Sequence, residues 1–156
     1  MSPDEKWLQV VIEVAIRNVY EGGGPFAAVI VADGEVMSSG QNRVTRDNDP
    51  TAHAEVVAIR AACAARRDYS LVGMTLYASC EPCPLCLSAA LWARVDRVVY
   101  AADRHDAARG GFDDREFYEL FARDRGSWTM PVHALAVPNR TKPFDAWLAN
   151  PGRVAY

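Results

Sequence analysis

Hydrophobic side chains near the N-terminus of the chain follow two different patterns, first a helical spacing and then a continuous run. Residues 4–20 predict a helix with one buried face, because apolar side chains recur at helical spacing, at Leu8, Val11, Ile12, Ala15, Ile16 and Val19. Residues 26–32 are continuously apolar and predict a buried strand. The Asp33-Gly34 pair is typical of a hairpin turn and predicts a second strand over 35–41.

The rest of the chain alternates between helical and strand patterns. Residues 47–51 have the composition of a loop that caps the helix after it. We expect helices over 52–65, 84–92, 115–123 and 142–149, and strands over 74–79, 97–101 and 131–137. Helices that alternate with buried strands predict an α/β fold, with a central sheet covered on both faces.

Composition and charge favour a single domain with a small substrate. The chain has 156 residues, 50% of them hydrophobic, which suits one core. Its formal net charge is −3, and its arginines are interspersed with acids, so a long nucleic-acid backbone is disfavoured as a partner. No signal peptide and no apolar stretch near the roughly 18 residues of a membrane span are evident. With four cysteines and no export signal, we expect a cytoplasmic protein whose thiols are free or bind metal.

The residues with the clearest chemical pattern are His53-Ala54-Glu55 and, further along, Pro82-Cys83-Pro84-Leu85-Cys86. Two cysteines three apart at the start of a predicted helix share one face and can bind one metal ion. His53, at the start of another predicted helix, can supply a third ligand. Three ligands leave a catalytic zinc with an open position for a water, whose pKa falls to roughly 7 from about 15.7. Glu55 is placed to take the proton of that water and pass it to a substrate.

Two other interpretations of the cysteines stay open. A Cys-x-x-Cys pair can be a redox couple, and Cys80 extends the run, so that His53 with three cysteines makes a closed structural zinc site. Glu55 has no role in a closed site. Cys80 lies at the predicted strand end before Pro82 turns the chain, so we expect its side chain to point elsewhere.

The His-x-Glu and Pro-Cys-x-x-Cys elements together are the signature of zinc deaminases, in which the Glu is the general acid and base. The chain resembles the cytidine deaminase superfamily over nearly its whole length, and more closely the bacterial guanine deaminase branch. The zinc motif is common to the superfamily, whereas Gly-Phe-Asp-Asp and the aromatic C-terminus point to guanine. The matching stretches are residues 23–26, 40–42, 48–55, 79–86, 111–114 and 143–147, and Tyr156.

This resemblance implies a three-layer α/β/α fold with a mixed five-stranded sheet. It implies one Zn²⁺ per subunit on His53, Cys83 and Cys86, with a water as fourth ligand. The activity implied is that of a zinc-dependent aminohydrolase, which converts guanine to xanthine and ammonia in purine catabolism. Glu55 is then the proton shuttle, and Asp114 is a second catalytic group that contacts the ring nitrogen and the amine.

The resemblance also implies which residues hold the base. Asn42 hydrogen-bonds the purine edge, since a carboxamide both donates and accepts, and Phe26 stacks on the purine face. A turn residue and a core residue are the plainer roles still open for these two. Ala54, Trp92 and Tyr156 are further candidates for contacts with the base, although Trp92 fits the core equally well.

The assembly implied by the resemblance is a homodimer of single deaminase domains, each spanning residues 1–156. The C-terminal segment, from about residue 110 to residue 156, is exchanged between the subunits. Tyr156 then reaches the pocket of the partner.

Two positions depart from the family pattern, and they keep other substrates open. Ala27 and Ser88 stand where the family usually has Gly, and we expect both to add bulk near the pocket. The alternatives are the same chemistry on guanosine, cytosine or a triazine such as ammeline, and the adenosine of a tRNA, although a basic C-terminal helix is absent. A noncatalytic, zinc-stabilised binding module is the alternative from a different class.

Overall fold

A mixed four-stranded sheet organises the N-terminal part of the chain. In the computed structural model, which describes residues 1–156, the strands lie in the order β2-β1-β3-β4. Strand β1 is antiparallel to both β2 and β3, whereas β3 and β4 are parallel. Their bounds are Ala27–Ala32 for β1, Glu35–Gln41 for β2, Thr75–Cys80 for β3 and Arg97–Ala102 for β4. The predicted α/β class and mixed sheet are thus confirmed.

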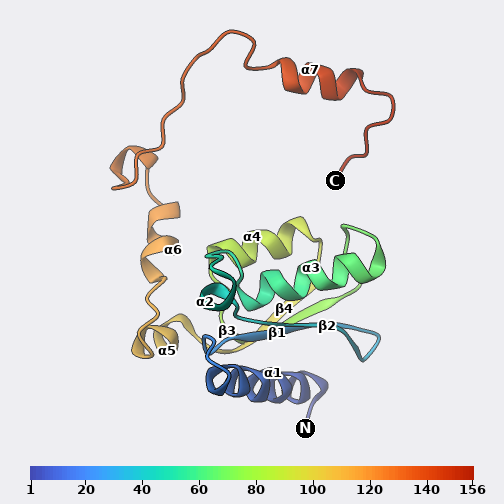
Figure 1. Cartoon of the computed structure of the whole chain (residues 1–156), viewed down its shortest axis with the longest axis vertical. Helices are drawn as coiled ribbons and strands as arrows, with labels where there is room; N and C mark the ends of the chain where they lie inside the picture. The colour runs from blue at the N-terminus through green and yellow to red at the C-terminus, as the bar shows by residue number, and fades with distance from the viewer. The chain divides into compact units, whose positions relative to one another are not determined.

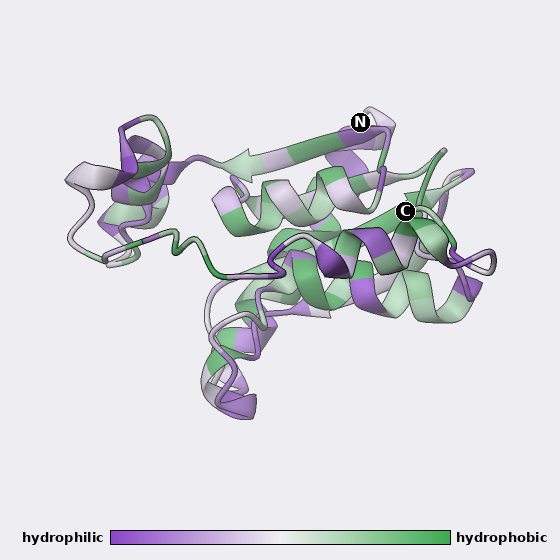
Figure 2. Ribbon diagram, turned by 90° about the horizontal axis from the view of Figure 1, so that it is seen from above, coloured by the Kyte–Doolittle hydropathy of each residue, from purple (hydrophilic) through white to green (hydrophobic).

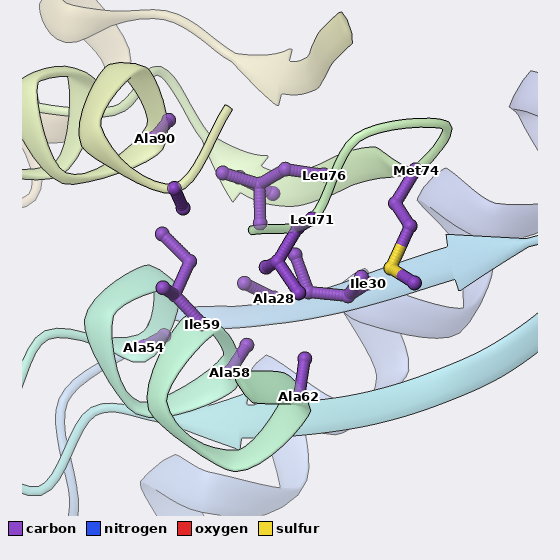
Figure 3. Close-up of a cluster of buried hydrophobic side chains, with 12 residues drawn as sticks. Ala28, Ile30, Ala54, Ala58, Ile59, Ala62, Leu71, Met74, Leu76 and Ala90 are labelled. Atoms are coloured by element: carbon purple, nitrogen blue, oxygen red, sulfur yellow. The ribbon is translucent and has the colours of Figure 1, made fainter. Parts of the chain in front are cut away.

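Helices cover both faces of this sheet. Helix α1 (Pro3–Tyr20) lies on one face, and α3 (Ala54–Arg66) and α4 (Pro84–Trp92) lie on the other (Figure 1). Successive residues of β1 serve the two faces in turn, because side chains alternate along a strand. Ile30 belongs to the cluster beneath α3 and α4 (Figure 3), and Val29 to the cluster beneath α1. The helices carry both hydrophilic and hydrophobic residues, as one-sided burial requires (Figure 2).

Close packing fixes α3 against β2. Gly40, in β2, faces the first turns of α3, and a Cβ at this position would overlap the Ala54 carbonyl and the Ala58 amide. Ser38, two residues earlier on the same strand, donates its hydroxyl to the Ala58 carbonyl at 2.7 Å. The helix therefore meets the strand almost backbone to backbone. This contact determines where the first residue of α3 lies.

The chain divides into two units, Met1–Tyr118 and Glu119–Tyr156. Two short helices of the first unit, α2 (Val44–Asp47) and α5 (Arg104–Arg109), were not expected from the sequence. The second unit holds the end of α6 (Arg115–Phe121), the 3₁₀ turn η1 (Arg125–Ser127) and α7 (Lys142–Ala149). None of its residues is buried.

The prediction of a fifth strand over 131–137 is wrong. These residues form no strand and pair with none, so the sheet has four strands. Strand propensity describes how well a residue fits a pleated, half-buried surface, and it does not by itself supply a neighbouring edge. Leu135, near the centre of this run, is 82% exposed.

None of the helices is both long and apolar enough to cross a membrane.

Candidate active site

The three predicted zinc ligands meet at the N-termini of two helices. His53 is the N-cap residue of α3 and Cys83 is the N-cap residue of α4, and both have extended backbone with φ of −67°. Neither side chain caps its own helix. Because the imidazole and the thiol are not used by the caps, both are free to face Cys86, in the first turn of α4.

The spacing of the three donor atoms fits zinc. His53 Nδ1 lies 3.4 Å from the Sγ atoms of both Cys83 and Cys86, and the two sulfurs are 3.7 Å apart. Tetrahedral zinc, with bonds of about 2.3 Å to sulfur and about 2.1 Å to nitrogen, separates two sulfur ligands by about 3.8 Å and a sulfur from a nitrogen by about 3.6 Å. His53, Cys83 and Cys86 form the complete group of potential ligands at this point.

The third cysteine of the run is not part of this group. Cys80 Sγ donates instead to the Asp103 carbonyl at 3.6 Å, in agreement with the expectation that its side chain points elsewhere. Burial raises the pKa of the Cys80 thiol to about 11. The pKa of the Cys83 thiol, in contrast, is lowered to about 4, mainly by its hydrogen bond with Cys86 and further by the one with His53. A thiolate is the form of cysteine that binds metal, and Cys83 is the cysteine of this run whose surroundings favour it, whereas the pKa of the Cys86 thiol is raised by its hydrogen bond with Cys83 and by burial. Geometry, with Cys80 outside the three-donor group, is therefore what separates Cys80 from the ligands.

Glu55 lies beside the ligand group. It is the second residue of α3, and it is only 8% exposed. Cys86 Sγ donates to its Oε2 at 3.4 Å. Burial raises the pKa of the Glu55 carboxyl above its usual range. A helix end places both side chains at one site, although His and Glu two apart would diverge within a helix.

A cavity of about 530 Å³ adjoins the ligand group. This volume is within the usual range for small-molecule sites. All of its lining residues belong to the first unit. Those that the sequence predicted are Phe26, Asn42, His53, Ala54, Glu55, Cys83 and Asp114. Those that it did not assign to the site include Val44, Thr45, Pro50, Ala107, Phe112 and Phe117.

Asp114 lines this cavity and carries an unpaired acceptor. Its Oδ1 atom is buried and has no hydrogen-bond partner. Burial, followed by the nearby charge of Cys83, raises the pKa of the Asp114 carboxyl. A buried acceptor without a partner is costly in a folded protein. A ligand that offers an N–H group at this position would relieve that cost.

Phe26 and Asn42 lie on the cavity wall and are held by contacts with other residues. The ring of Phe112 packs edge-on against that of Phe26, with centroids 4.9 Å apart. The Asn42 backbone amide donates to the Phe26 carbonyl at 3.0 Å. Fully buried Asn18 donates through Nδ2 to the carbonyls of Gly24 at 2.8 Å and Asn42 at 3.0 Å. Phe112 belongs to the Gly-Phe-Asp-Asp element, so that motif was the available signal for it, whereas Val44 and Thr45 of α2 are β-branched and do not predict a helix.

Several residues named from the sequence lie elsewhere. Trp92 is 60% exposed and does not line the cavity. Ala27 faces α1 in the other core cluster, and neither it nor Ser88 lines the cavity, so the expectation that they add bulk there is wrong. Tyr156 belongs to the second unit and is 72% exposed.

Comparisons with known proteins agree with this geometry. Residues 1–102 match the family model of the cytidine and deoxycytidylate deaminase zinc-binding region. The chain is 47% identical to the guanine deaminase of Bacillus subtilis (strain 168) over 144 residues, which are 92% of each chain. An X-ray structure of B. subtilis guanine deaminase superimposes with a TM-score of 0.95 at 45% identity, covering 97% of this chain and 98% of that one.

A more distant relative is a tRNA-specific adenosine deaminase from Aquifex aeolicus (strain VF5). It is 39% identical over 98 residues, which are 63% of this chain and 65% of the relative. The family match includes all three metal-binding donors and the acid beside them, and the B. subtilis match extends over nearly all of both chains. The chain therefore belongs to the zinc-binding cytidine and deoxycytidylate deaminase family.

Proposed function

We propose that this protein is a zinc-dependent aminohydrolase that converts guanine and water to xanthine and ammonia. The observation that carries the proposal is that one cavity is lined by two of the three donors, His53 and Cys83, together with Glu55 and with Asp114, whose Oδ1 atom has no partner. Similarity to a guanine deaminase over nearly the whole length of both chains supports guanine as the substrate. The tRNA-specific relative matches a shorter part of the chain.

The catalytic steps are assigned to residues around the cavity. His53, Cys83 and Cys86 would hold the zinc ion, which would act as the Lewis acid that lowers the pKa of the attacking water. Glu55 takes a proton from this water and delivers it to the ring nitrogen next to the carbon that bears the amine. The proton of the hydroxyl group added from water then passes to the amine, the C–N bond breaks, and ammonia leaves as the new carbonyl forms. Asp114, which accepts a hydrogen bond from the amine, assists this second transfer.

Residues of two other segments, together with Ala54 of α3, hold the base. The Asn42 carboxamide has both a donor and acceptors for the purine edge, and one of its acceptor positions already receives the Val44 amide at 3.3 Å. Phe26 lines the cavity and offers an aromatic ring on which the base stacks. Ala54, fully buried and next to Glu55, forms part of the cavity wall and leaves room for the flat ring.

The direct test is ammonia release by the zinc-loaded protein from guanine, guanosine, cytosine, adenine and ammeline, and from the adenosine of a tRNA. Guanine is expected to give the highest kcat/KM. A higher value for guanosine or for the tRNA would replace guanine as the substrate. Absence of release from every compound would reject the enzymatic proposal. The Glu55→Gln variant serves as the blank because it retains the zinc donors.

A homodimer with exchanged C-terminal segments is the assembly that we propose. The second unit has no buried residue and exposes large apolar side chains, among them Met130, Leu135, Phe144 and Leu148. Segments of this composition are ordered at a net cost unless they bury apolar surface. Strand β4 is the last in the sheet order and has one neighbour, so its outer edge offers unpaired backbone groups. Residues 112–114 and 117 line the cavity of their own chain, so the segment that we propose to be exchanged begins at residue 119 rather than at about residue 110 and ends at residue 156.

Complementation between two impaired variants tests the exchange. One variant carries Glu55→Gln, and the other lacks residues 152–156 and with them Tyr156. If Tyr156 of one copy completes the pocket of the other, subunit mixing by mild denaturation and refolding restores activity above the sum of the two samples. Mixed samples that stay at the sum, or a monomer in analytical ultracentrifugation, would contradict the exchange.

A further inference from the structure

Arg104, the first residue of α5, connects two segments of the first unit. Its guanidinium grips the carboxylate of Glu81 with two hydrogen bonds, from Nη2 at 2.6 Å and from Nε at 3.1 Å. The Arg104 backbone amide donates to the same carboxylate at 2.9 Å. On its other side, the guanidinium lies over the ring of Tyr118, 3.6 Å from the centroid. The Tyr118 hydroxyl donates to the Pro82 carbonyl.

These contacts join the zinc-ligand loop to the segment that carries Asp114. Glu81 and Pro82 directly precede the ligand Cys83, while Tyr118 lies in α6, one turn after Asp114. The cluster of Glu81, Pro82, Arg104 and Tyr118, here called the arginine bridge, therefore closes the loop that runs from α5 to α6. Arg104 itself does not line the cavity.

The arginine bridge is stronger than a surface ion pair. The Glu81 side chain is 12% exposed and that of Arg104 is 32% exposed, so water screens the pair less than it screens exposed pairs. The bridge also depends on the shape of arginine. A planar guanidinium binds a carboxylate with two parallel N–H groups and stacks on an aromatic ring at the same time, which a lysine ammonium cannot do.

We propose that Arg104 is a positioning residue, which holds Asp114 in register with the zinc ligands. This inference rests on the proposed function, since it takes Asp114 to act on the departing amine. Phe26 and Asn42 come from other elements and are held by Asn18 and by each other. The Phe26 ring also touches Phe112 of the loop that the bridge closes, but Asp114 depends on that loop alone. Loss of the bridge is therefore expected to disturb the chemical step more than it weakens binding of the base.

Three variants separate this role from a general effect of charge. Arg104→Met removes the bridge, and Arg104→Lys keeps the charge but loses the fork and the stack. The matched control is Arg109→Met, because Arg109 is in the same helix, is 82% exposed and pairs only with Asp106 across one turn. For Arg104→Met we expect kcat on guanine to fall by about tenfold to 10²-fold, since small displacements of catalytic groups have effects of this size.

Some properties of the variants are expected to stay unchanged. For Arg104→Met, KM stays within about twofold of that of the unmodified protein, as it should when the loss is confined to the chemical step, and zinc content is unchanged. Arg104→Lys behaves like Arg104→Met, and Arg109→Met like the unmodified protein. A decrease in zinc content, or a rise in KM that matches the loss in kcat/KM, would show a merely structural role and overturn the inference.

Hydrogen exchange gives a readout that does not depend on turnover. In the zinc-loaded protein without substrate, Arg104→Met is expected to speed amide exchange in residues 110–118 by about tenfold, whereas Arg109→Met leaves it unchanged. Unchanged exchange in Arg104→Met would overturn the inference even if guanine proves to be the substrate. Inactivity of the unmodified protein towards every base would instead reject the proposed function.

Discussion

The two units of the chain contain similar kinds of side chain and use them differently. In the first unit, apolar residues such as Leu76 and Val11 are fully buried on opposite faces of the sheet. In the second unit, no residue is buried, and local order comes from contacts such as the Trp128 indole, which donates to the Leu120 carbonyl at 2.9 Å. The difference shows that an apolar pattern in the sequence predicts side chains that are stabilised by burial. Whether they are buried depends on a neighbouring surface that the pattern does not specify.

The comparison extends to chemistry. Every residue of the ligand group and of the cavity wall comes from the first unit. The second unit contributes none of them. If the chemistry and the core both belong to the first unit, substitutions there should change turnover and the free energy of unfolding directly. Substitutions in the second unit should act through assembly of the dimer.

The largest effect is expected for Glu55→Gln, which removes the proton shuttle. Turnover should fall by about 10²–10⁴-fold, the usual contribution of a positioned acid and base, while zinc content stays the same. The control is Asp145→Asn in α7, an exposed acid of the second unit. Steady-state ammonia assays check both. An equal loss in Asp145→Asn would show that the chemistry is not confined to the first unit.

Truncation of one leucine in each unit tests the contrast in burial. Leu76→Ala should lower the free energy of unfolding by about 3 kcal/mol, because it leaves a cavity in the core. Leu135→Ala should change it by less than about 0.5 kcal/mol in a sample dilute enough to be monomeric, and should weaken the dimer instead. Urea denaturation at several protein concentrations measures both. A comparable loss for Leu135→Ala at every concentration would contradict the contrast.

Amide-to-acid changes compare the units at polar positions. Asn18→Asp replaces an N–H donor that serves two carbonyls by an acceptor, and should lower the free energy of unfolding by about 2 kcal/mol. In the second unit, Asn150 uses its side-chain oxygen to accept from the Gly152 amide at 2.9 Å, a role that aspartate retains. Asn150→Asp is therefore expected to be neutral in the same denaturation assay. An unchanged free energy of unfolding in both variants would contradict the role of Asn18 in supporting the cavity wall.

The smallest effect is expected from deletion of residues 152–156. Removal of Tyr156 should lower kcat/KM for guanine by about tenfold, as loss of a residue that closes a pocket admits water. The thermal unfolding of the first unit should not change. Undiminished activity towards guanine would show that residues 152–156 take no part in the site. Higher activity towards guanosine would indicate that the pocket has become open enough to admit a ribose.

Local signals explain what could be predicted from the sequence. Helix α1 and the hairpin of β1 and β2 follow from residue spacing and from one Asp-Gly turn. His53, Cys83 and Cys86 were identified because their motifs report helix ends. The helices predicted to begin at residues 52 and 115 begin at Ala54 and Arg115 in the structure.

Features that depend on distant partners could not be predicted. Arg104 meets Glu81, which lies 23 residues earlier, and nothing in either local sequence indicates the pair. The strand expected over 131–137 needs an edge that its own pattern cannot specify. Phe112 gains its contact with Phe26 only through the folded chain, so its motif could mark it without giving it a role.

The near-contact of α3 with β2 at Gly40 has a consequence for how such a protein can diversify. Because backbone meets backbone there, the metal-binding end of α3 has no side chain through which a substitution could shift it gradually. Substitutions in α2 and in the loop before α6, whose residues also line the cavity, do not meet this constraint. They can reshape the cavity while the metal-binding end of α3 stays in place.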